Sequence, residues 1–342
     1  MTSKIDRAKG PVFIAGPERS GTSLIYALLA SHPNIAMSRR TNMWTHYYNQ
    51  YGDISKQENF ERCLSMMMRY KRLHKLNPDP ERIRHEFLMG ERTYARLFAI
   101  FEEHFAEQLN KPRWGDKSLN TERYTDLIIA AYPGARIIHM ARDPRDRYSS
   151  SLKRWKVSRS GIGGATALWL TTIGLATQYQ ARYPDQYLIV RYEDLAAEPE
   201  AVLKKVCAFI GEEYSPQMLS MRGAKQFRDK GGNSSYGSRE PGKISANSVG
   251  KFQQVLSPSQ VAFMQLFSKK SMQAYGYEPI RTNLGFWDWV KFLLFELPFN
   301  ISRMFAWWAR ESALNRIGRD LPSERVVTEK EALARQQKGS VA

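Results

Sequence analysis

The most constraining feature of the sequence is an apolar stretch that runs straight into a short glycine-containing loop and then into an apolar helix. Residues 12–15, Val-Phe-Ile-Ala, predict a buried strand, and residues 24–31 predict the helix. The loop between them reads Gly-Pro-Glu-Arg-Ser-Gly-Thr-Ser over residues 16–23. A turn from a strand into a helix directs several backbone N–H groups at one place, where the helix dipole adds positive potential. We therefore expect an anion-binding site at this loop.

Two later apolar stretches indicate that the first strand belongs to a parallel sheet. Residues 136–141 and 187–191 each predict a buried strand, and helices are expected over 160–181 and 258–274. Strands that alternate with helices favour a parallel sheet covered on both faces. The predicted fold class is α/β: three layers around a central parallel sheet. A helical insertion at 55–112 and an aromatic-rich helical appendage near the C-terminus are added to it.

The first loop differs from the nucleotide-binding loop of kinases in one residue type. Gly16 and Gly21 are separated by four residues, as in the Walker A pattern, but that pattern continues with a lysine and then serine or threonine. Here Gly21 is followed by Thr22 and Ser23, and the cation of the loop is Arg19, inside it. A P-loop-type nucleotide or small-molecule kinase stays an alternative, although it would lack its phosphate-gripping lysine.

A second anion site is expected at the end of the strand predicted over 136–141. Arg142 follows this strand in the run Arg-Asp-Pro-Arg-Asp, and Ser150 lies eight residues after Arg142. An arginine in this place can hold a phosphate by two charge-assisted hydrogen bonds, and the Ser150 hydroxyl can donate another. Ligands of α/β sheets bind outside the carboxyl ends of the strands. Both sites therefore suit one ligand that carries phosphates at two ends.

Together these motifs resemble those of the sulfotransferases that use 3′-phosphoadenosine-5′-phosphosulfate (PAPS), of the Golgi-type and bacterial carbohydrate and tyrosylprotein kinds. Residues 17–23, Pro-x-Arg-Ser-Gly-Thr-Ser, resemble their 5′-phosphosulfate loop, and residues 142–150 are similar to their 3′-phosphate motif. Arg-Tyr-Glu-Asp-Leu at 191–195 resembles a further family stretch. The resemblance covers residues 11–278 and implies a P-loop-like sulfotransferase domain over residues 1–280.

The resemblance also implies which residues bind the nucleotide. Tyr192 is expected near the adenine, and the segment 248–252 is similar to the loop that closes over the nucleotide in the family. The expected PAPS-binding residues are Arg19, Ser20, Gly21, Thr22, Ser23, Arg142, Ser150, Tyr192, Ser248 and Lys251. No metal is required, because 3′,5′-adenosine bisphosphate is a good leaving group once cations meet its charge.

The implied reaction is in-line transfer of a sulfuryl group from PAPS to a hydroxyl of a carbohydrate, a lipid-linked compound or another small molecule. Such a transfer depends mainly on positioning and on stabilisation of charge, as phosphoryl transfer does. Arg19 is one expected electrostatic catalyst. Lys117 is the other, in the run Trp-Gly-Asp-Lys that lies between the two phosphate motifs.

The general base departs from the family pattern. Several sulfotransferases of this kind carry a glutamate soon after the second short strand, but here Arg40 stands at that place. An acceptor hydroxyl still needs a base positioned against it. His46 is the expected base because of its intrinsic pKa, and Glu18 and Asp116 are the alternatives.

The acceptor side is expected to be built from the insertion at 55–112 and the residues just before it. Tyr47, Tyr48, Tyr51 and the methionines at 66–68 could line an apolar, adaptable pocket. The alternative is that these side chains are helix core. They do not identify the acceptor.

Charge and composition narrow the classes of partner. The chain has 51 Lys and Arg against 34 Asp and Glu, a net charge of +17, so anionic partners are expected. A non-catalytic basic protein that binds membrane or polyanions is a third class, but it leaves the two ordered phosphate motifs unexplained. Nucleic acid is not the expected partner.

The six histidines include no pair at i,i+3 or i,i+4, and no Cys-x-x-Cys accompanies them. No metal site is therefore expected.

The segment 286–308 contains nine Phe or Trp residues, and charged residues interrupt it too often for a membrane span. It belongs to an expected helical appendage at 281–321 and suits an amphipathic hairpin, broken at Pro298, at a membrane interface. Packing on the catalytic domain, or a homodimer contact, is the alternative.

The protein is expected to be cytoplasmic and peripheral at the inner membrane face, because no leader-like stretch opens the chain. Residues 322–342 are expected to be disordered.

Overall fold

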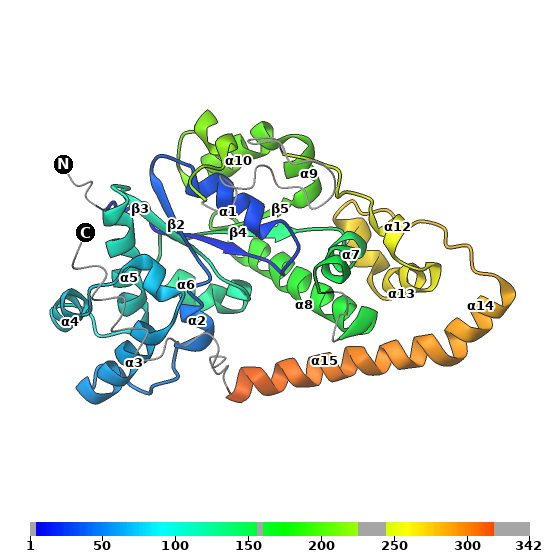
Figure 1. The fold of residues 1–342 in the computed structure, drawn as a ribbon, viewed down its shortest axis with the longest axis horizontal. Helices are drawn as coiled ribbons and strands as arrows, with labels where there is room; N and C mark the ends of the chain where they lie inside the picture. The colour runs from blue at the N-terminus through cyan, green and yellow to red at the C-terminus, as the bar shows by residue number, and fades with distance from the viewer. Residues whose placement is uncertain (1–4, 156–159, 225–243, 318–342) are drawn as a thin grey trace. The chain divides into compact units, whose positions relative to one another are not determined.

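The computed structural model of the protein describes residues 5–155, 160–224 and 244–317 (Figure 1). Its five strands form one sheet in the order β2-β3-β1-β4-β5, and every pair whose register is defined is parallel. The strands are β1 (Val12–Ala15), β2 (Ile35–Arg39), β3 (Arg113–Lys117), β4 (Arg136–Ala141) and β5 (Tyr187–Arg191). A parallel sheet with helical connections is the predicted α/β fold class, which is confirmed.

The strand predictions at 12–15, 136–141 and 187–191 coincide with β1, β4 and β5. These stretches are apolar because parallel strands covered by helices are buried on both faces. The sequence did not indicate β3 as a strand, since three of its five residues are charged. All five are nevertheless buried, so β3 carries its polar groups into the interior, where they must find partners.

The chain divides into two compact units, and each is described by itself. The described part of the first unit comprises residues 5–13 and 32–135. Its helices are α2 (Met43–His46), α3 (Gln57–Arg69), η1 (Leu73–Leu76), α4 (Pro80–Leu88), α5 (Tyr94–Gln108), η2 (Thr121–Tyr124) and α6 (Thr125–Ala131). The helical insertion expected at 55–112 corresponds to α3, η1, α4 and α5, and α5 packs on β2 and β3.

The second unit comprises residues 14–31 and 136–317, within the described ranges. Its helices before residue 225 are α1 (Thr22–Ala30), α7 (Pro144–Trp155), α8 (Gly161–Arg182), α9 (Tyr192–Ala197), α10 (Pro199–Ile210) and η3 (Pro216–Ser220). Those after residue 243 are α12 (Phe252–Val255), α13 (Pro258–Ala274), α14 (Phe286–Lys291), η4 (Phe292–Glu296) and α15 (Leu297–Ile317). Helix α10 packs on β4 and α8 packs on β5, on opposite sides of these strands in Figure 1.

Two of the predicted helices have the expected bounds within two residues. The helix expected over 160–181 is α8, and the one expected over 258–274 is α13. Helix α13 begins with a capping box, in which the Ser257 side chain accepts from the Gln260 backbone N–H and the Gln260 side chain accepts in return. The start of α13 was predictable because Ser257 and Pro258 are local signals of a helix N-terminus.

The hairpin expected around Pro298 is wrong. Helix α14, the π-helical turn η4 and α15 follow one another without a reversal of direction (Figure 1). Pro298 is the second residue of α15. The π-helical turn η4 lies directly before this proline, and a π-type turn is one of the local adjustments by which a helix continues past an interruption of its hydrogen-bond ladder.

One other expectation, the disordered tail at 322–342, falls outside the described part of the chain. Within the described ranges, no helix is both long enough and apolar enough to cross a bilayer.

Gly115 in the centre of β3 supplies a test of sheet packing. A Cβ atom there would lie 2.5 Å from the Val12 carbonyl oxygen and 2.5 Å from the Met37 sulfur. Gly115→Ala should therefore lower the free energy of unfolding by roughly 1–3 kcal/mol, the usual effect of overpacking a filled core. The measurement is urea denaturation followed by circular dichroism.

Gly174→Ala in α8 is the matched control, because nothing lies within 4 Å of a Cβ atom added there. It should raise stability by about 0.5–1 kcal/mol, since alanine favours the helix interior. Equal stability of the two variants would contradict the close packing described for β3.

Candidate active site

The loop between β1 and α1 depends on two glycines. Gly16 and Gly21 have φ angles of 112° and 91°, which side chains rarely adopt. A Cβ atom on Gly16 would lie 2.6 Å from the Met140 carbonyl oxygen, and one on Gly21 would lie 2.5 Å from the Tyr192 ring. The loop therefore lies directly against the end of β4 and the start of α9.

Arg19 has a φ of 69°, in the left-handed region that a non-glycine residue adopts at an energetic cost. Its Nε and Nη2 atoms donate to the Ser150 hydroxyl at 3.0 and 2.8 Å. Ser150 lies on α7 and is the last residue of the second phosphate motif. The two motifs thus meet through side chains that are 131 residues apart in the sequence.

Arg142 joins the same cluster. Its Nη1 donates to the Arg19 carbonyl oxygen at 3.0 Å, and its Nη2 donates to the Ser248 carbonyl oxygen at 2.8 Å. The guanidinium carbon lies 4.3 Å from the centre of the Tyr192 ring. Among the described residues, Nε of Arg142 is buried without a hydrogen-bond partner. One arginine therefore connects the first loop, the aromatic residue of α9 and the late segment.

The late segment is held by a residue that the sequence analysis did not single out. Asp146 accepts from the backbone N–H groups of Gly250 at 2.6 Å and Phe252 at 2.9 Å. The Ser248 hydroxyl lies 2.6 Å from the Tyr192 hydroxyl. Burial raises the pKa of Asp146, while the two backbone donors and Arg142 lower it. The second aspartate of the Arg-Asp-Pro-Arg-Asp run was the available signal for this anchor.

Of the expected nucleotide-binding residues, Lys251 is the one that points elsewhere. Its Nζ atom donates to the Gln254 side chain at 3.3 Å, within its own turn and exposed to solvent. Thr22 and Ser23 are the first residues of α1. The cluster itself brings together Arg19, Ser20, Gly21, Arg142, Ser150, Tyr192 and Ser248.

A third arginine adds to the positive charge. Arg147 on α7 is buried, and burial lowers its pKa to about 10, with Glu18 opposing that shift and Arg142 and Arg19 adding to it. Its Nε has no hydrogen-bond partner among the described residues, and the same is true of the fully buried Ser20 hydroxyl. Buried donors without acceptors, beside several cations, fit a ligand that brings anionic oxygens.

The other charged residues of the second motif are structural. Arg145 forms an ion pair with Asp143 at 2.7 Å and also donates to the Glu278 carbonyl oxygen. The Asp143 N–H donates to Glu193 at 3.0 Å, and the Trp169 indole donates to the Arg142 carbonyl oxygen at 2.9 Å. The turn that carries Arg142 is therefore fixed from several sides.

The remaining expected catalytic residues lie in the first unit. Lys117 is the last residue of β3 and is buried, and its carbonyl oxygen accepts from the Arg40 N–H at 2.8 Å. The next residue, Ser118, accepts from the Asn42 N–H at 2.9 Å through its hydroxyl. Lys117 and Arg40 thus mark the adjacent carboxyl ends of β3 and β2.

His46 lies on the same side of α2 as Asn42. Its ring is 6.3 Å from the ring of Tyr70, whose hydroxyl accepts from the Asn42 amide at 2.8 Å. The His46 side chain is half-buried. Within the first unit, Asn42 therefore lies between Tyr70, which His46 contacts, and Ser118, the residue after Lys117.

Asp116, the alternative base in this unit, faces the interior. It is fully buried, and the Ser38 hydroxyl lies 2.9 Å from one of its oxygens and 2.7 Å from an oxygen of Glu102. Burial raises the pKa of both carboxyl groups, well above the usual range for Glu102, and the charge of Asp116 adds to the rise at Glu102. A hydroxyl has one proton to share between two carboxyls, so Glu102 is protonated and donates to Ser38 while Asp116 accepts from it. The Asp116 carboxylate is thus engaged in a hydrogen bond in the buried interior of the first unit.

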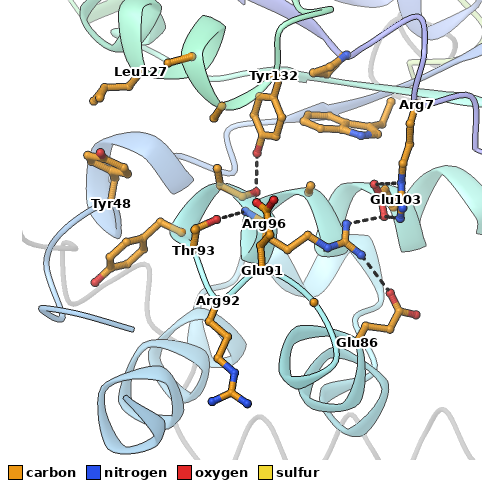
Figure 2. A pocket seen from close by; sticks show the side chains of 18 of the residues that line it. Arg7, Tyr48, Glu86, Glu91, Arg92, Thr93, Arg96, Glu103, Leu127 and Tyr132 are labelled. Atoms are coloured by element: carbon orange, nitrogen blue, oxygen red, sulfur yellow. Dashed lines mark hydrogen bonds and ion pairs between the residues drawn. The ribbon is translucent and has the colours of Figure 1, made fainter. Parts of the chain in front are cut away.

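The expected acceptor pocket is only partly supported by the residues predicted for it. Tyr47 and Met67 are fully buried core residues, whereas Tyr48 lines a pocket of about 1430 Å³. Figure 2 shows this pocket, with Tyr48 and Leu127 on one side and charged side chains on the other. It is lined by residues of the first unit, among them Trp44, Tyr48, Tyr94, Arg96, Glu103, Leu127 and Tyr132.

The charged side chains that line this pocket form ion pairs with one another. Glu103 accepts from Arg96 at 2.9 Å and from Arg7 at 2.8 Å, as the dashed lines of Figure 2 show. Trp44 contacts Phe98 and Tyr48 contacts Tyr94, whereas His46 contacts Tyr70. Trp44 and Tyr48 line the pocket and His46 does not, so the pocket is not built around the candidate base.

Among the described residues, no group of three His, Cys, Asp or Glu side chains could hold a metal ion.

The buried carboxyl pair makes stability depend on pH. Folding raises the pKa of Glu102, so the folded chain binds more protons than the unfolded chain above the ordinary glutamate pKa of about 4.3. Stability is thus lost as pH rises from there through the folded pKa. Glu102→Gln, which can still donate to Ser38, should be more stable than the wild type at alkaline pH and should lose less stability between about pH 5 and 9.

The measurement is urea denaturation over that pH range, with Glu58→Gln, an exposed glutamate on α3, as the control. The control should follow the wild-type curve. A Glu102→Gln variant that also follows it would contradict the protonated carboxyl described here.

Comparison with known proteins agrees with this geometry. The model of the sulfotransferase family matches residues 11–216, more than half of the chain. The protein-tyrosine sulfotransferase A of Caenorhabditis elegans is 23% identical over 61% of this chain and 51% of its own length, and the Drosophila melanogaster protein-tyrosine sulfotransferase is 24% identical over 61% and 39%. The chain thus spans about half of these relatives or less.

A solved structure shares the fold. The sulfotransferase domain of the olefin synthase from Synechococcus PCC 7002 is 19% identical, with a TM-score of 0.54 over 81% of this chain and 96% of that domain. The family match, the shared fold and the order of the two phosphate motifs lead to one conclusion: the chain belongs to the sulfotransferase family.

Proposed function

We propose that the protein transfers a sulfuryl group from PAPS to a hydroxyl group of an acceptor. The observation that carries the proposal is the meeting of Arg19 and Arg142, from two different strand ends, in one cluster. A nucleotide with anionic groups at its 3′ and 5′ positions needs two such sites on one surface. Family membership supports the same reaction.

In this proposal the loop of residues 16–23 binds the 5′-phosphosulfate through its N–H groups, Arg19 and the Ser20 hydroxyl. Arg142 and Ser150 bind the 3′-phosphate, and Arg147 adds positive charge beneath them. Arg142 donates to two carbonyl oxygens and Arg19 donates to Ser150. These donors must turn to phosphate oxygens when the nucleotide binds.

The chemical step forms a bond between the acceptor oxygen and sulfur and breaks the bond between sulfur and the phosphate oxygen of PAPS. The leaving group is 3′,5′-adenosine bisphosphate, and the acceptor proton goes to the base, His46 in this proposal. Lys117 and Arg19 stabilise the charge that develops on the leaving oxygen. The burial of Lys117 strengthens that effect, because charges interact more strongly away from water.

The acceptor class is set less sharply than the donor. The named relatives act on protein tyrosine, so a tyrosyl or other phenolic hydroxyl joins the carbohydrate, lipid-linked and small-molecule hydroxyls as a candidate. A kinase reaction is disfavoured because Thr22 stands where the Walker lysine would be. A protein that only binds polyanions would not need the specific hydrogen bonds that Arg142 makes to two backbone carbonyl oxygens.

Binding of 3′,5′-adenosine bisphosphate should depend on Arg142. Arg142→Ala removes a bidentate donor to the 3′-phosphate, so the dissociation constant should rise about 10- to 100-fold, whereas that for 5′-AMP, which lacks the 3′-phosphate, should change much less. The measurement is isothermal titration calorimetry.

Arg182→Ala, an exposed arginine on α8, is the matched control and should bind both nucleotides as the wild type does. Arg142→Lys, which keeps the positive charge, is the second variant in case Arg142→Ala does not fold. Equal weakening of the two nucleotides by Arg142→Ala, in a variant that melts like the wild type, would refute a 3′-phosphate contact.

Turnover should depend on Lys117 more than nucleotide binding does. Lys117→Met removes a cation that acts in the transition state, so kcat should fall about 100- to 1000-fold. The assay follows release of 3′,5′-adenosine bisphosphate from PAPS, with phenolic, tyrosyl-peptide and sugar acceptors in parallel. Lys56→Met, an exposed lysine of the same unit, is the control. Wild-type turnover by Lys117→Met would exclude Lys117 from the reaction.

A further inference from the structure

The C-terminal helices α14 and α15 are apolar on two opposite sides, and the described residues of the chain cover only one of them. Phe292 and Met304 are buried in a cluster with residues of α7, α8, α12 and α13. Leu297, Ile301, Trp307 and Trp308 pack against the same cluster. This inner side explains why the segment is helical and docked. It does not explain the aromatic residues on the outer side.

The docking on α8 is specific. Arg303 donates to the Ser160 carbonyl oxygen at 3.0 Å, and the Trp308 indole donates to the Thr171 hydroxyl at 3.2 Å. Gly163 allows close approach, because a Cβ atom there would lie 2.0 Å from the Asn300 carbonyl oxygen. Figure 1 shows α15 running beside α8. The rotation of the helix is thus fixed, and with it the side that faces away from α8.

The outer side consists of large apolar residues that lie close together along the chain. Six of them are between 58% and 77% exposed: Phe286, Trp287, Leu294, Phe295, Phe299 and Phe305. We call these six residues the outer apolar face. Single exposed apolar residues are common on soluble proteins, but a contiguous group of this kind marks a surface that meets a membrane or another macromolecule.

Charge decides between a lipid surface and a second copy of this chain. The net charge of +17 makes two copies repel one another, whereas it attracts the chain to a bilayer with anionic headgroups. Tryptophan and phenylalanine are the side chains that settle at the boundary between headgroups and acyl chains. The segment cannot cross a bilayer, since no described helix is long and apolar enough.

We infer that the outer apolar face binds the protein to the surface of an anionic membrane, with α14 and α15 lying along the interface. The inference is independent of the proposed sulfotransferase activity, because it rests on side chains that take no part in the nucleotide cluster. It gives the protein a peripheral attachment through a helix that is rigidly fixed to its own second unit.

The test is co-sedimentation of the full-length chain with vesicles of phosphatidylglycerol and with vesicles of phosphatidylcholine. The wild type should bind the phosphatidylglycerol vesicles more tightly, and added salt should weaken this binding. The triple variant Trp287→Ser, Phe295→Ser, Phe299→Ser should bind at least about tenfold more weakly, because three aromatic side chains that would enter the bilayer interface are lost.

The control is Met89→Ser with Leu266→Ser, which removes two apolar side chains that are equally exposed outside this face. It should bind vesicles as the wild type does. Binding of 3′,5′-adenosine bisphosphate by each variant reports separately on the nucleotide site. Wild-type vesicle binding by the triple variant would overturn the inference. So would a wild-type dimer, found by light scattering without vesicle binding, that the triple variant converts to monomer.

Discussion

The guanidinium group of Arg142 connects segments that are far apart in the sequence. It donates to the backbone of the first loop and to the backbone of the late segment, and it covers the face of Tyr192. Because one planar group with fixed donor directions makes all three contacts, the positions of these segments are coupled. The turn that carries Arg142 must in turn be rigid, and the ion pair of Arg145 with Asp143 makes it so.

The same cluster concentrates positive charge where little water can reach it. Arg147 is buried enough for its pKa to fall, and the neighbouring arginines contribute to that fall. Such a cluster carries two energetic costs, because like charges repel and buried donors without acceptors are unfavourable. An anionic ligand relieves both penalties. The electrostatics thus favours binding of a multiply charged nucleotide over a neutral one before any specific contact is considered.

The fold could be predicted where its signals are local. Apolar runs defined β1, β4 and β5, and the loop glycines and Arg142 were visible from their places after strands. The anchor Asp146 and the buried Arg147 were not, because their roles depend on partners about a hundred residues away or on burial that spacing does not reveal. Strand β3 was not predicted, because its charged residues find their hydrogen-bond partners through tertiary contacts, which the sequence does not show.

The hairpin at Pro298 failed for a related reason. A proline usually interrupts a helix, and the π-helical turn directly before Pro298 was not readable from composition. The residues that line the pocket of the first unit also come from five separate stretches, so an expectation based on one cluster of tyrosines found only Tyr48. Long-range placement, more than residue type, limited what the sequence could reveal.

The most direct measurement is a crystal structure of the protein with 3′,5′-adenosine bisphosphate. The account predicts the 5′-phosphate against the N–H groups of the loop at 16–23, with the 3′-phosphate of the same molecule in hydrogen-bond contact with Arg142 and Ser150. A nucleotide that engages only one of these two turns, or that binds elsewhere on the protein, would contradict it.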